Sequence, residues 1–250
     1  MSETDAAADP LRIDRRSDRV VATLDRPATR NAIDQQLVDR LHALCAELES
    51  QPRTLIIAGA GGVFASGADI AQLLQRRAEE ALQGINTRAF ERIRALPMPV
   101  IAAIDGYALG GGAELAYAAD LRIGTPSLKI GNPETGLGII AAAGATWRLP
   151  EIVGEARAAQ MLLTGQVLDA ETALAWGLVS ALHPAEELMD AAHVLADRIA
   201  ANDAVATQHT KRALRAGHDV DAVLTLQAEL FESPEKQRRM TAFLDRRAGR

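Results

Sequence analysis

The stretch PVIAAIDGYALGGGAELAYAADLRI, residues 99–123, decides the fold. Its run Val100–Ile104 is nearly all apolar, which is typical of a strand covered on both faces. Three glycines at 110–112 follow, and Glu114 comes two residues after the last of them in a helical pattern. Glycine loses more backbone freedom on folding than any other residue, so three in a row indicate that something approaches this backbone closely. The stretch predicts a buried strand, a glycine-rich turn and a helix that carries a carboxylate.

The same order of strand, turn and helix recurs outward from this stretch. Arg19–Leu24 and Thr54–Gly59 are predicted strands. A helical pattern follows the first, and the turn AGGVFASGAD with a long helical stretch to Leu96 follows the second. Shorter strands are predicted in DLRIG (120–124) and SLKIG (127–131), and a last one at Gly177–Leu182. Strands that alternate with helices predict an α/β fold.

The C-terminal part has a different pattern. From Pro184 onward no strand is predicted, and four amphipathic segments read as helices, with Asp203, Asp219 and Ser233 as N-caps of the last three. We therefore expect an α/β core with the active site over residues 1–190 and a helical region over residues 191–250. Such a helical region packs either on its own core or on a neighbouring copy.

Composition limits the classes of function. The chain of 250 residues is 48% hydrophobic and 24% charged, as in ordinary globular proteins. Its net charge of −6 argues against a general nucleic-acid binder. No segment is long and apolar enough to span a membrane, and the N-terminus MSETDAAADP resembles neither a signal peptide nor a transit peptide. We expect a cytoplasmic protein with no nucleic-acid or membrane partner.

Cysteine and histidine give no sign of a metal site. Cys45 is the single cysteine, which excludes an internal disulfide, and its apolar surroundings LVDRLHALCAEL predict a buried position. The five histidines have no metal-ligand spacing, so no metal is expected.

Two glycine-rich loops share one design. The loop at Gly59–Gly67 lacks the third glycine of a dinucleotide motif because Phe64 stands there, and no phosphate-binding G-K-[ST] occurs. Each loop leads into a helix with an acid near its start, Asp69 or Glu114. The first N–H groups of a helix have no partner inside it. Two such groups that converge make an oxyanion hole; ordinary turn chemistry is the alternative.

A second carboxylate follows the central stretch. Glu134 stands after Pro133 in the turn SLKIGNPETGLG, and the segment between Glu114 and Glu134 is long enough to run out and return. Two carboxylates near an oxyanion hole suit general acid–base catalysis. The alternatives are a first-turn acid favoured by the helix dipole for Glu114 and an exposed turn residue for Glu134.

These motifs resemble the crotonase superfamily, and within it the enoyl-CoA hydratases, over nearly the whole chain. Six segments match in family order: LDRPATRNAID, FASGADI, the central stretch 99–123, GNPETGLG, LLTGQVLDAETALAWGLV and MTAFLDRR. The resemblance implies a crotonase-like spiral of repeated β-β-α turns with a C-terminal helical trimerisation region. It also implies a homotrimer or a dimer of trimers.

The resemblance further implies an acyl-CoA thioester substrate and no separate cofactor. The N–H groups of Ala68 and Gly111 would form the oxyanion hole, Glu114 would act on the attacking water, and Glu134 would deliver a proton to the α-carbon. The reaction would be syn addition of water to a trans-2-enoyl-CoA, which gives a 3-hydroxyacyl-CoA in fatty acid metabolism.

Further binding residues come from the same resemblance. Substrate contacts are expected at Ala65, Asp69, Ile70, Gly138 and Phe243. Phe243 of a neighbouring copy would border the adenine, while an arginine of the same helix, at 246 or 247, would meet a phosphate.

Two departures from the family pattern concern the acyl pocket. Ala141–Ala142 stand where many hydratases carry Pro-Gly, and Trp147 stands where a smaller polar residue is common. These changes are expected to alter chain-length preference, although Trp147 also suits a plain core position.

Other functions remain open at this stage. The nearest alternative is another crotonase-type enzyme, either an enoyl-CoA isomerase or an acyl-CoA hydrolase. A more distant one is a non-catalytic acyl-CoA-binding protein. The presence of both Glu114 and Glu134 favours the hydratase.

Overall fold

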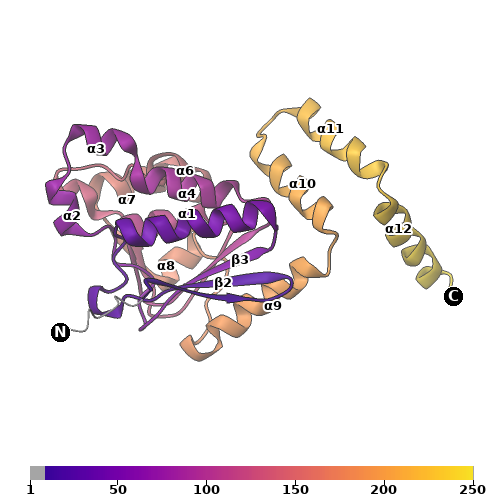
Figure 1. Ribbon diagram of the computed structural model, residues 1–250, viewed down its shortest axis with the longest axis horizontal. Helices are drawn as coiled ribbons and strands as arrows, with labels where there is room; N and C mark the ends of the chain where they lie inside the picture. The colour runs from indigo at the N-terminus through magenta and orange to yellow at the C-terminus, as the bar shows by residue number, and fades with distance from the viewer. Residues whose placement is uncertain (1–8, 250) are drawn as a thin grey trace, which may run out of the picture.

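The structure is a computed structural model that describes residues 9–249 (Figure 1). Most of the N-terminal segment on which the absence of a targeting signal was predicted, residues 1–8, lies outside the described residues. No helix among residues 9–249 has the length and apolar character needed to cross a membrane.

A five-stranded sheet forms the centre of the body, in the order β1-β2-β3-β4-β6. The strands β1 and β2 pair antiparallel, and the others pair parallel. The strands span Leu11–Arg15 (β1), Arg19–Leu24 (β2), Thr54–Gly59 (β3), Val100–Ile104 (β4) and Leu121–Gly124 (β6). The α/β class and four of the predicted strand positions are therefore confirmed.

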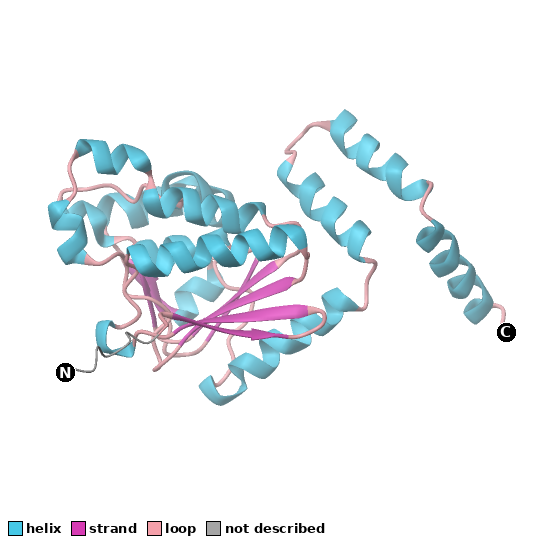
Figure 2. Cartoon of the chain, in the orientation of Figure 1, coloured by secondary structure: helices cyan, strands magenta, loops and turns pink. Residues whose placement is uncertain are grey.

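Helices cover both faces of this sheet (Figure 2). Alternate residues of a strand face opposite sides. Leu55 and Ile57 of β3 therefore pack into the larger core, which holds α1 (Gln35–Ser50) and α4 (Ile85–Ala95). Ile56 packs on the other side against α9 (Leu188–Ala200). The nearly unbroken apolar runs in β3 and β4 reflect this double coverage.

A second sheet of three strands has the order β5-β7-β8. It consists of Tyr107–Leu109 (β5), Lys129–Gly131 (β7) and Val167–Asp169 (β8). The remaining body elements are η1 (Pro27–Thr29), α2 (Ile70–Gln75), α3 (Ala78–Gln83), α5 (Gly111–Ala118), η2 (Pro133–Leu137), α6 (Ala145–Val153), α7 (Glu155–Thr164), α8 (Ala170–Ala175) and η3 (Ala185–Glu187). The strands β1, β5 and β8 were not predicted; β5 and β8 have only three residues each, too few for a periodic pattern.

Two expectations from the sequence were wrong. Gly177–Leu182 forms no strand; it bends after α8, beginning with Gly177 at φ 75°, and only Leu182 forms a β-bridge, with Gly124. The long helix to Leu96 is three helices, α2, α3 and α4. The chain is extended at Arg76 and Arg77, and Gly84 at φ 60° ends α3 and begins α4. Glycine adopts this left-handed backbone without steric cost, so it breaks the helix there.

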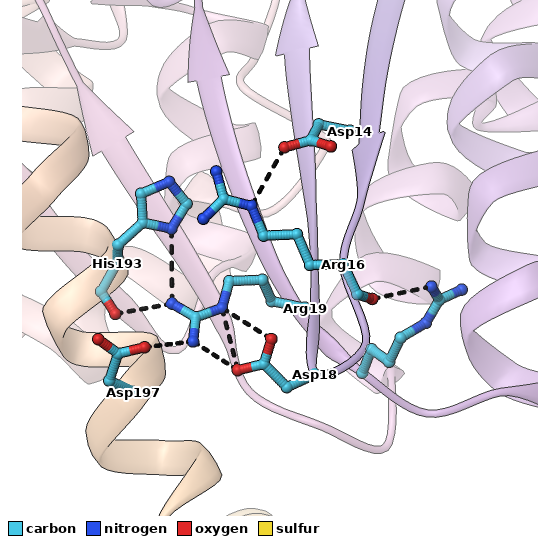
Figure 3. A network of polar contacts seen from close by, with 7 residues as sticks. Asp14, Arg16, Asp18, Arg19, His193 and Asp197 are labelled. Atoms are coloured by element: carbon cyan, nitrogen blue, oxygen red, sulfur yellow. Dashed lines mark hydrogen bonds and ion pairs between the residues drawn. The ribbon is translucent and has the colours of Figure 1, made fainter.

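A polar network ties α9 to the sheet (Figure 3). The buried Arg19 of β2 donates to the backbone oxygen of His193 at 2.8 Å and also pairs with Asp18 and Asp197. The predicted division of the chain at residue 190 falls within α9. Because α9 packs on the sheet, its contacts place it with the body, while the division itself stays a prediction.

The last three helices extend away from the body (Figure 1). They are α10 (Ala204–Arg215), α11 (Val220–Phe231) and α12 (Pro234–Arg247), and the predicted N-caps Asp203, Asp219 and Ser233 each accept a hydrogen bond from a first-turn N–H. α10 is fastened to the body by Lys211, whose Nζ donates to Met98 O at 2.8 Å and pairs with Asp120 at 2.7 Å.

Candidate active site

A cavity of about 530 Å³ lies between α2–α4 on one side and the start of α5 with η2 on the other. Its wall contains Ala68, Gly111, Glu114 and Glu134. The structure therefore brings together the two predicted oxyanion residues and the two predicted acids, which are up to 66 positions apart in the sequence (134 − 68). We call this space the central cavity.

Each glycine of the triplet at 110–112 is required for a different structural reason. Gly110 has φ 52°, and a Cβ there would lie 3.1 Å from Glu134 Oε1. A Cβ on Gly112 would lie 2.3 Å from Ala65 O, so this position needs glycine for close packing alone. Gly111 faces the central cavity, where a Cβ would lie 3.4 Å from both Ala68 N and the Asn86 amide nitrogen. The approach of a ligand explains only Gly111.

The two glycine-rich loops converge as predicted. Ile33 bonds to both neighbours of Ala68, because its N–H donates to Gly67 O at 2.8 Å and its oxygen accepts from Asp69 N at 3.0 Å. In this pairing the Ala68 N–H faces away from Ile33, on the side of the cavity that Ala68 lines. Gly111 is the first residue of α5, so its N–H has no acceptor inside the helix.

Glu114 lies in the first turn of α5 and is only 4% exposed. Its Oε1 accepts hydrogen bonds from the backbone N–H groups of Ala143 at 2.7 Å and Ala145 at 3.2 Å. Burial raises the pKa of Glu114 to about 7, and the negative charge of Glu134 adds to this rise, against the two backbone donors. The helix dipole alone does not explain so buried an acid.

Glu134 lies in η2 directly after Pro133 and is also buried, so the exposed-turn interpretation is wrong. Its Oε1 accepts from the Asn132 amide at 3.4 Å, while its Oε2 is buried and has no hydrogen-bond partner within residues 9–249. Burial raises the pKa of Glu134, although the Asn132 amide and a backbone N–H oppose the rise. An acceptor atom left without a donor in a cavity wall suits contact with a bound molecule.

The departure at Ala141–Ala142 does reach the cavity, because Ala142 lines it beside Ala143. Trp147 does not line it. Its indole N–H on α6 donates to Glu91 of α4 at 3.1 Å, so this residue links two helices. An effect of Trp147 on the acyl pocket would therefore be indirect.

The other predicted binding residues lie outside the wall of the cavity. Ala65 pairs with Ala108 in a β-bridge, Asp69 caps α2 by accepting from Gln72 N, and Ile70 is exposed at the start of that helix. Gly138 ends η2 at φ 74°, and Phe243 is exposed on α12. Contacts of these residues with substrate stay predictions.

Several residues of the site had not been singled out. Asn86 lines the cavity beside Gly111, and the backbone of Ala143 and Ala145 holds Glu114. Asn132 stands two residues before Glu134 and bonds to it. Backbone donors leave no sequence signal; a polar residue between Gly131 and Pro133 was the one available hint. Within the described residues, no group of His, Cys, Asp and Glu side chains could hold a metal.

The family follows from comparison with known proteins. The family model described as enoyl-CoA hydratase/isomerase matches residues 16–249. The chain belongs to this family. As a member of the enoyl-CoA hydratase/isomerase family it has solved relatives of the same fold, which confirms the predicted crotonase-like architecture. An enoyl-CoA hydratase from Bacillus anthracis superposes with a TM-score of 0.88 at 30% identity, covering 95% of this chain and 96% of that one.

Curated relatives in the family are similar along almost their whole length. A short-chain-enoyl-CoA hydratase of Clostridium acetobutylicum is 36% identical over 238 residues, covering 91% of each chain. A crotonyl-CoA hydratase of Syntrophomonas wolfei is 36% identical over 238 residues, covering 91% of this chain and 92% of that one. A 2,3-dehydroadipyl-CoA hydratase of Escherichia coli is 34% identical over 247 residues, covering 95% and 96%.

Proposed function

We propose that this protein is an enoyl-CoA hydratase that adds water to a trans-2-enoyl-CoA and gives a 3-hydroxyacyl-CoA. The observation that carries the proposal is the presence of two buried acids, Glu114 and Glu134, in one cavity wall with two converging backbone N–H groups. A protein that only bound acyl-CoA would have no use for both acids, whose burial opposes their ionisation.

The proposed reaction begins with the thioester oxygen accepting hydrogen bonds from Ala68 N–H and Gly111 N–H. Water adds to the β-carbon, and the π electrons of the double bond move toward the thioester, where the two N–H groups stabilise the developing negative charge. Glu114 accepts a proton from the water while Glu134 gives its proton to the α-carbon. Proton exchange with solvent restores both acids. Because both acids line one cavity, addition to a single face of the substrate, syn addition, is supported.

Near neutral pH, Glu114 and Glu134 together are expected to carry one proton. The step needs one ionised and one protonated acid. Burial raises the pKa of Glu114 to about 7, and the charge of Glu134 adds to this rise because two carboxylates in one buried site resist ionising together. A pair that holds one proton near neutral pH is the form the reaction uses. No redox or metal step is required, so coenzyme A enters only as part of the substrate.

The assembly proposed is a homotrimer or a dimer of trimers. The helices α11 and α12 expose large apolar side chains, and of the elements outside them α11 contacts chiefly α10. A neighbouring copy would cover these side chains, and Phe243 with an arginine of α12 would then reach the coenzyme A of that copy. A cytoplasmic role in fatty acid breakdown fits this activity.

The test is an ultraviolet assay that follows loss of the conjugated thioester of crotonyl-CoA, chosen because relatives are named for short-chain and crotonyl substrates. Hydration removes the absorbance and gives 3-hydroxybutyryl-CoA by mass spectrometry. Release of free thiol without hydration would instead identify a hydrolase. Conversion of a 3-enoyl-CoA to the 2-enoyl isomer without hydration would identify an isomerase, and binding without turnover would reject catalysis.

A further inference from the structure

The side chain of Asn132 contacts three groups that belong to different parts of the site. It lies 3.0 Å from the Tyr117 hydroxyl, 3.3 Å from Gly110 O and 3.4 Å from Glu134 Oε1. Asn132 is 1% exposed and Tyr117 is fully buried, so water does not compete for these contacts. A buried amide with three neighbours is held by all of them.

The chemistry of the three neighbours fixes the orientation of the amide. Gly110 O is a carbonyl and accepts only, and Glu134 Oε1 also accepts only when the proton that Glu134 delivers is on the unpartnered Oε2. The Asn132 NH₂ group must face both of them, which leaves its oxygen toward Tyr117. The Tyr117 hydroxyl must therefore donate. Burial raises the pKa of Tyr117, so the hydroxyl keeps the proton that it donates.

This arrangement couples two catalytic elements. Tyr117 lies on α5, three residues after Glu114, and Gly110 caps the start of the same helix. Asn132 precedes η2, which carries Glu134. Tyr117 and Gly110, at two points of α5, therefore both bond to the Asn132 amide. The same amide bonds to Oε1 of Glu134, while the other carboxylate oxygen, Oε2, has no partner within the described residues.

We propose that Tyr117 is a positioning residue, which acts through Asn132 to fix the Glu134 carboxylate for proton transfer at the α-carbon. The inference rests on the proposed function, because it assigns that proton transfer to Glu134. Tyr117 does not line the central cavity and touches no reacting atom. Without its hydroxyl, the Asn132 amide loses the partner that sets its orientation, and its NH₂ group no longer faces Glu134 in a single state.

A double-mutant cycle of Tyr117→Phe and Asn132→Leu tests the coupling. Tyr117→Phe keeps the ring in the core and is expected to lower kcat for hydration about tenfold, the upper end of what one lost hydrogen bond between neutral groups contributes, with KM changed less than about twofold. Asn132→Leu is expected to lower kcat by about tenfold or more. If Tyr117 acts only through Asn132, the double variant is no slower than Asn132→Leu alone.

A second readout isolates Glu134. Exchange of the α-hydrogens of butyryl-CoA in deuterated water, followed by NMR, requires a base to remove an α-proton and return a deuteron, without any water addition. Tyr117→Phe is expected to slow this exchange by the same factor as hydration. Thr125→Val is the matched control, since Thr125 is a buried hydroxyl that donates to Asp105 at 2.9 Å away from the cavity. It should change neither rate.

The outcomes separate the two proposals. The positioning role is overturned if the two losses of kcat multiply in the double variant. It is also overturned if folded Tyr117→Phe exchanges the α-hydrogens of butyryl-CoA at the wild-type rate. The same holds if the Thr125→Val control slows both reactions as much as Tyr117→Phe does. If the wild-type protein exchanges α-hydrogens but does not hydrate crotonyl-CoA, the proposed function fails while the coupling through Asn132 remains measurable.

Discussion

The body and the last two helices differ in how far they bury their large apolar side chains. In the body, Phe64, Phe90 and Tyr117 are all at most 1% exposed. On α11 and α12, Phe231 is 52% exposed and Leu244 is 63% exposed. The body buries a large apolar core, although it also leaves single side chains such as Leu74 and Leu163 exposed. On the tail, residues 219–249, Leu226 is the one buried residue of α11 and α12, so most of their apolar side chains stay uncovered by the chain itself.

This comparison separates what a single copy of the chain provides from what requires a second molecule. Burial in the body does more than stabilise the fold, because it also raises the pKa of Glu114 and of Glu134. Exposed apolar surface of the kind found on the tail marks contact sites on other molecules. Chemistry therefore depends on the interior of one copy, whereas the proposed assembly would depend on the surface of its tail.

The largest effects are expected at the acids of the body. Glu114→Gln and Glu134→Gln should each lower the rate of crotonyl-CoA hydration by about 10²-fold or more, the range for loss of a general acid or base. Binding of a saturated acyl-CoA, measured by calorimetry, should survive both changes. Turnover near the wild-type rate in either variant would reject the role of that residue.

The next effect concerns the oxyanion hole. Gly111→Pro removes the N–H, and loss of one oxyanion donor typically lowers the rate by about 10²–10³-fold. Gly111→Ala keeps the N–H but places a methyl group 3.4 Å from Ala68 N, so it should raise KM more than it lowers kcat. Kinetics beside melting curves decide the case. If activity falls only in proportion to the amount of folded protein, the glycine triplet is a structural turn and has no oxyanion role.

A smaller effect tests what burial does to Glu114. Its pKa is about 7 in the folded protein and 4.5 when unperturbed, so the unfolded chain ionises first as pH rises. Stability is lost between these values, by about 3 kcal/mol in total. Glu114→Gln has no such loss, so it should gain stability relative to wild type between pH 4.5 and pH 8 in urea titrations. Parallel curves for the two proteins would contradict this.

The tail is tested by removing it. Deletion of residues 219–250 should leave protein that sediments as a monomer or aggregates, because the apolar surface proposed to join copies would be gone or incomplete. Leu244→Asp is a milder version that should weaken assembly, while Leu82→Asp on α3, where the leucine is 84% exposed, is the matched control and should not. A truncated protein that still sediments as a trimer would show that the body alone assembles.

The smallest effect is local to one cap. Asp203→Ala removes the acceptor for Ala206 N at the start of α10 and should cost about 1 kcal/mol of unfolding free energy, with hydration kinetics unchanged. Asp245→Ala, at an exposed acid within α12, should change stability by less than about 0.5 kcal/mol. Equal effects of both substitutions in urea titrations would show that the cap adds nothing.

Local patterns were enough for much of this protein. The strands β2, β3 and β4, the caps Asp203, Asp219 and Ser233, and the convergence of the two glycine-rich loops were all predicted from the sequence. These features depend on periodicity, on side chains that bond to nearby backbone, and on turns that only glycine allows. Motif order along the chain was likewise enough to identify the family.

Other features depend on contacts between segments that are distant in the sequence, so only the tertiary structure decided them. The three-residue strands β5 and β8 exist because they pair with β7. Gly177–Leu182 lies beside β6 and bonds to it through Ser180 N–H and Ala181 O, but its bends after Gly177 prevent a regular strand. The different reasons for Gly110, Gly111 and Gly112 depend on what lies opposite each one. Asn132 bonds to Glu134 two residues away and to Tyr117 fifteen residues away, and no local pattern specifies the second contact. The sequence determines which residues carry the chemistry, whereas burial and distance, which set their pKa values and partners, arise only when the chain is folded.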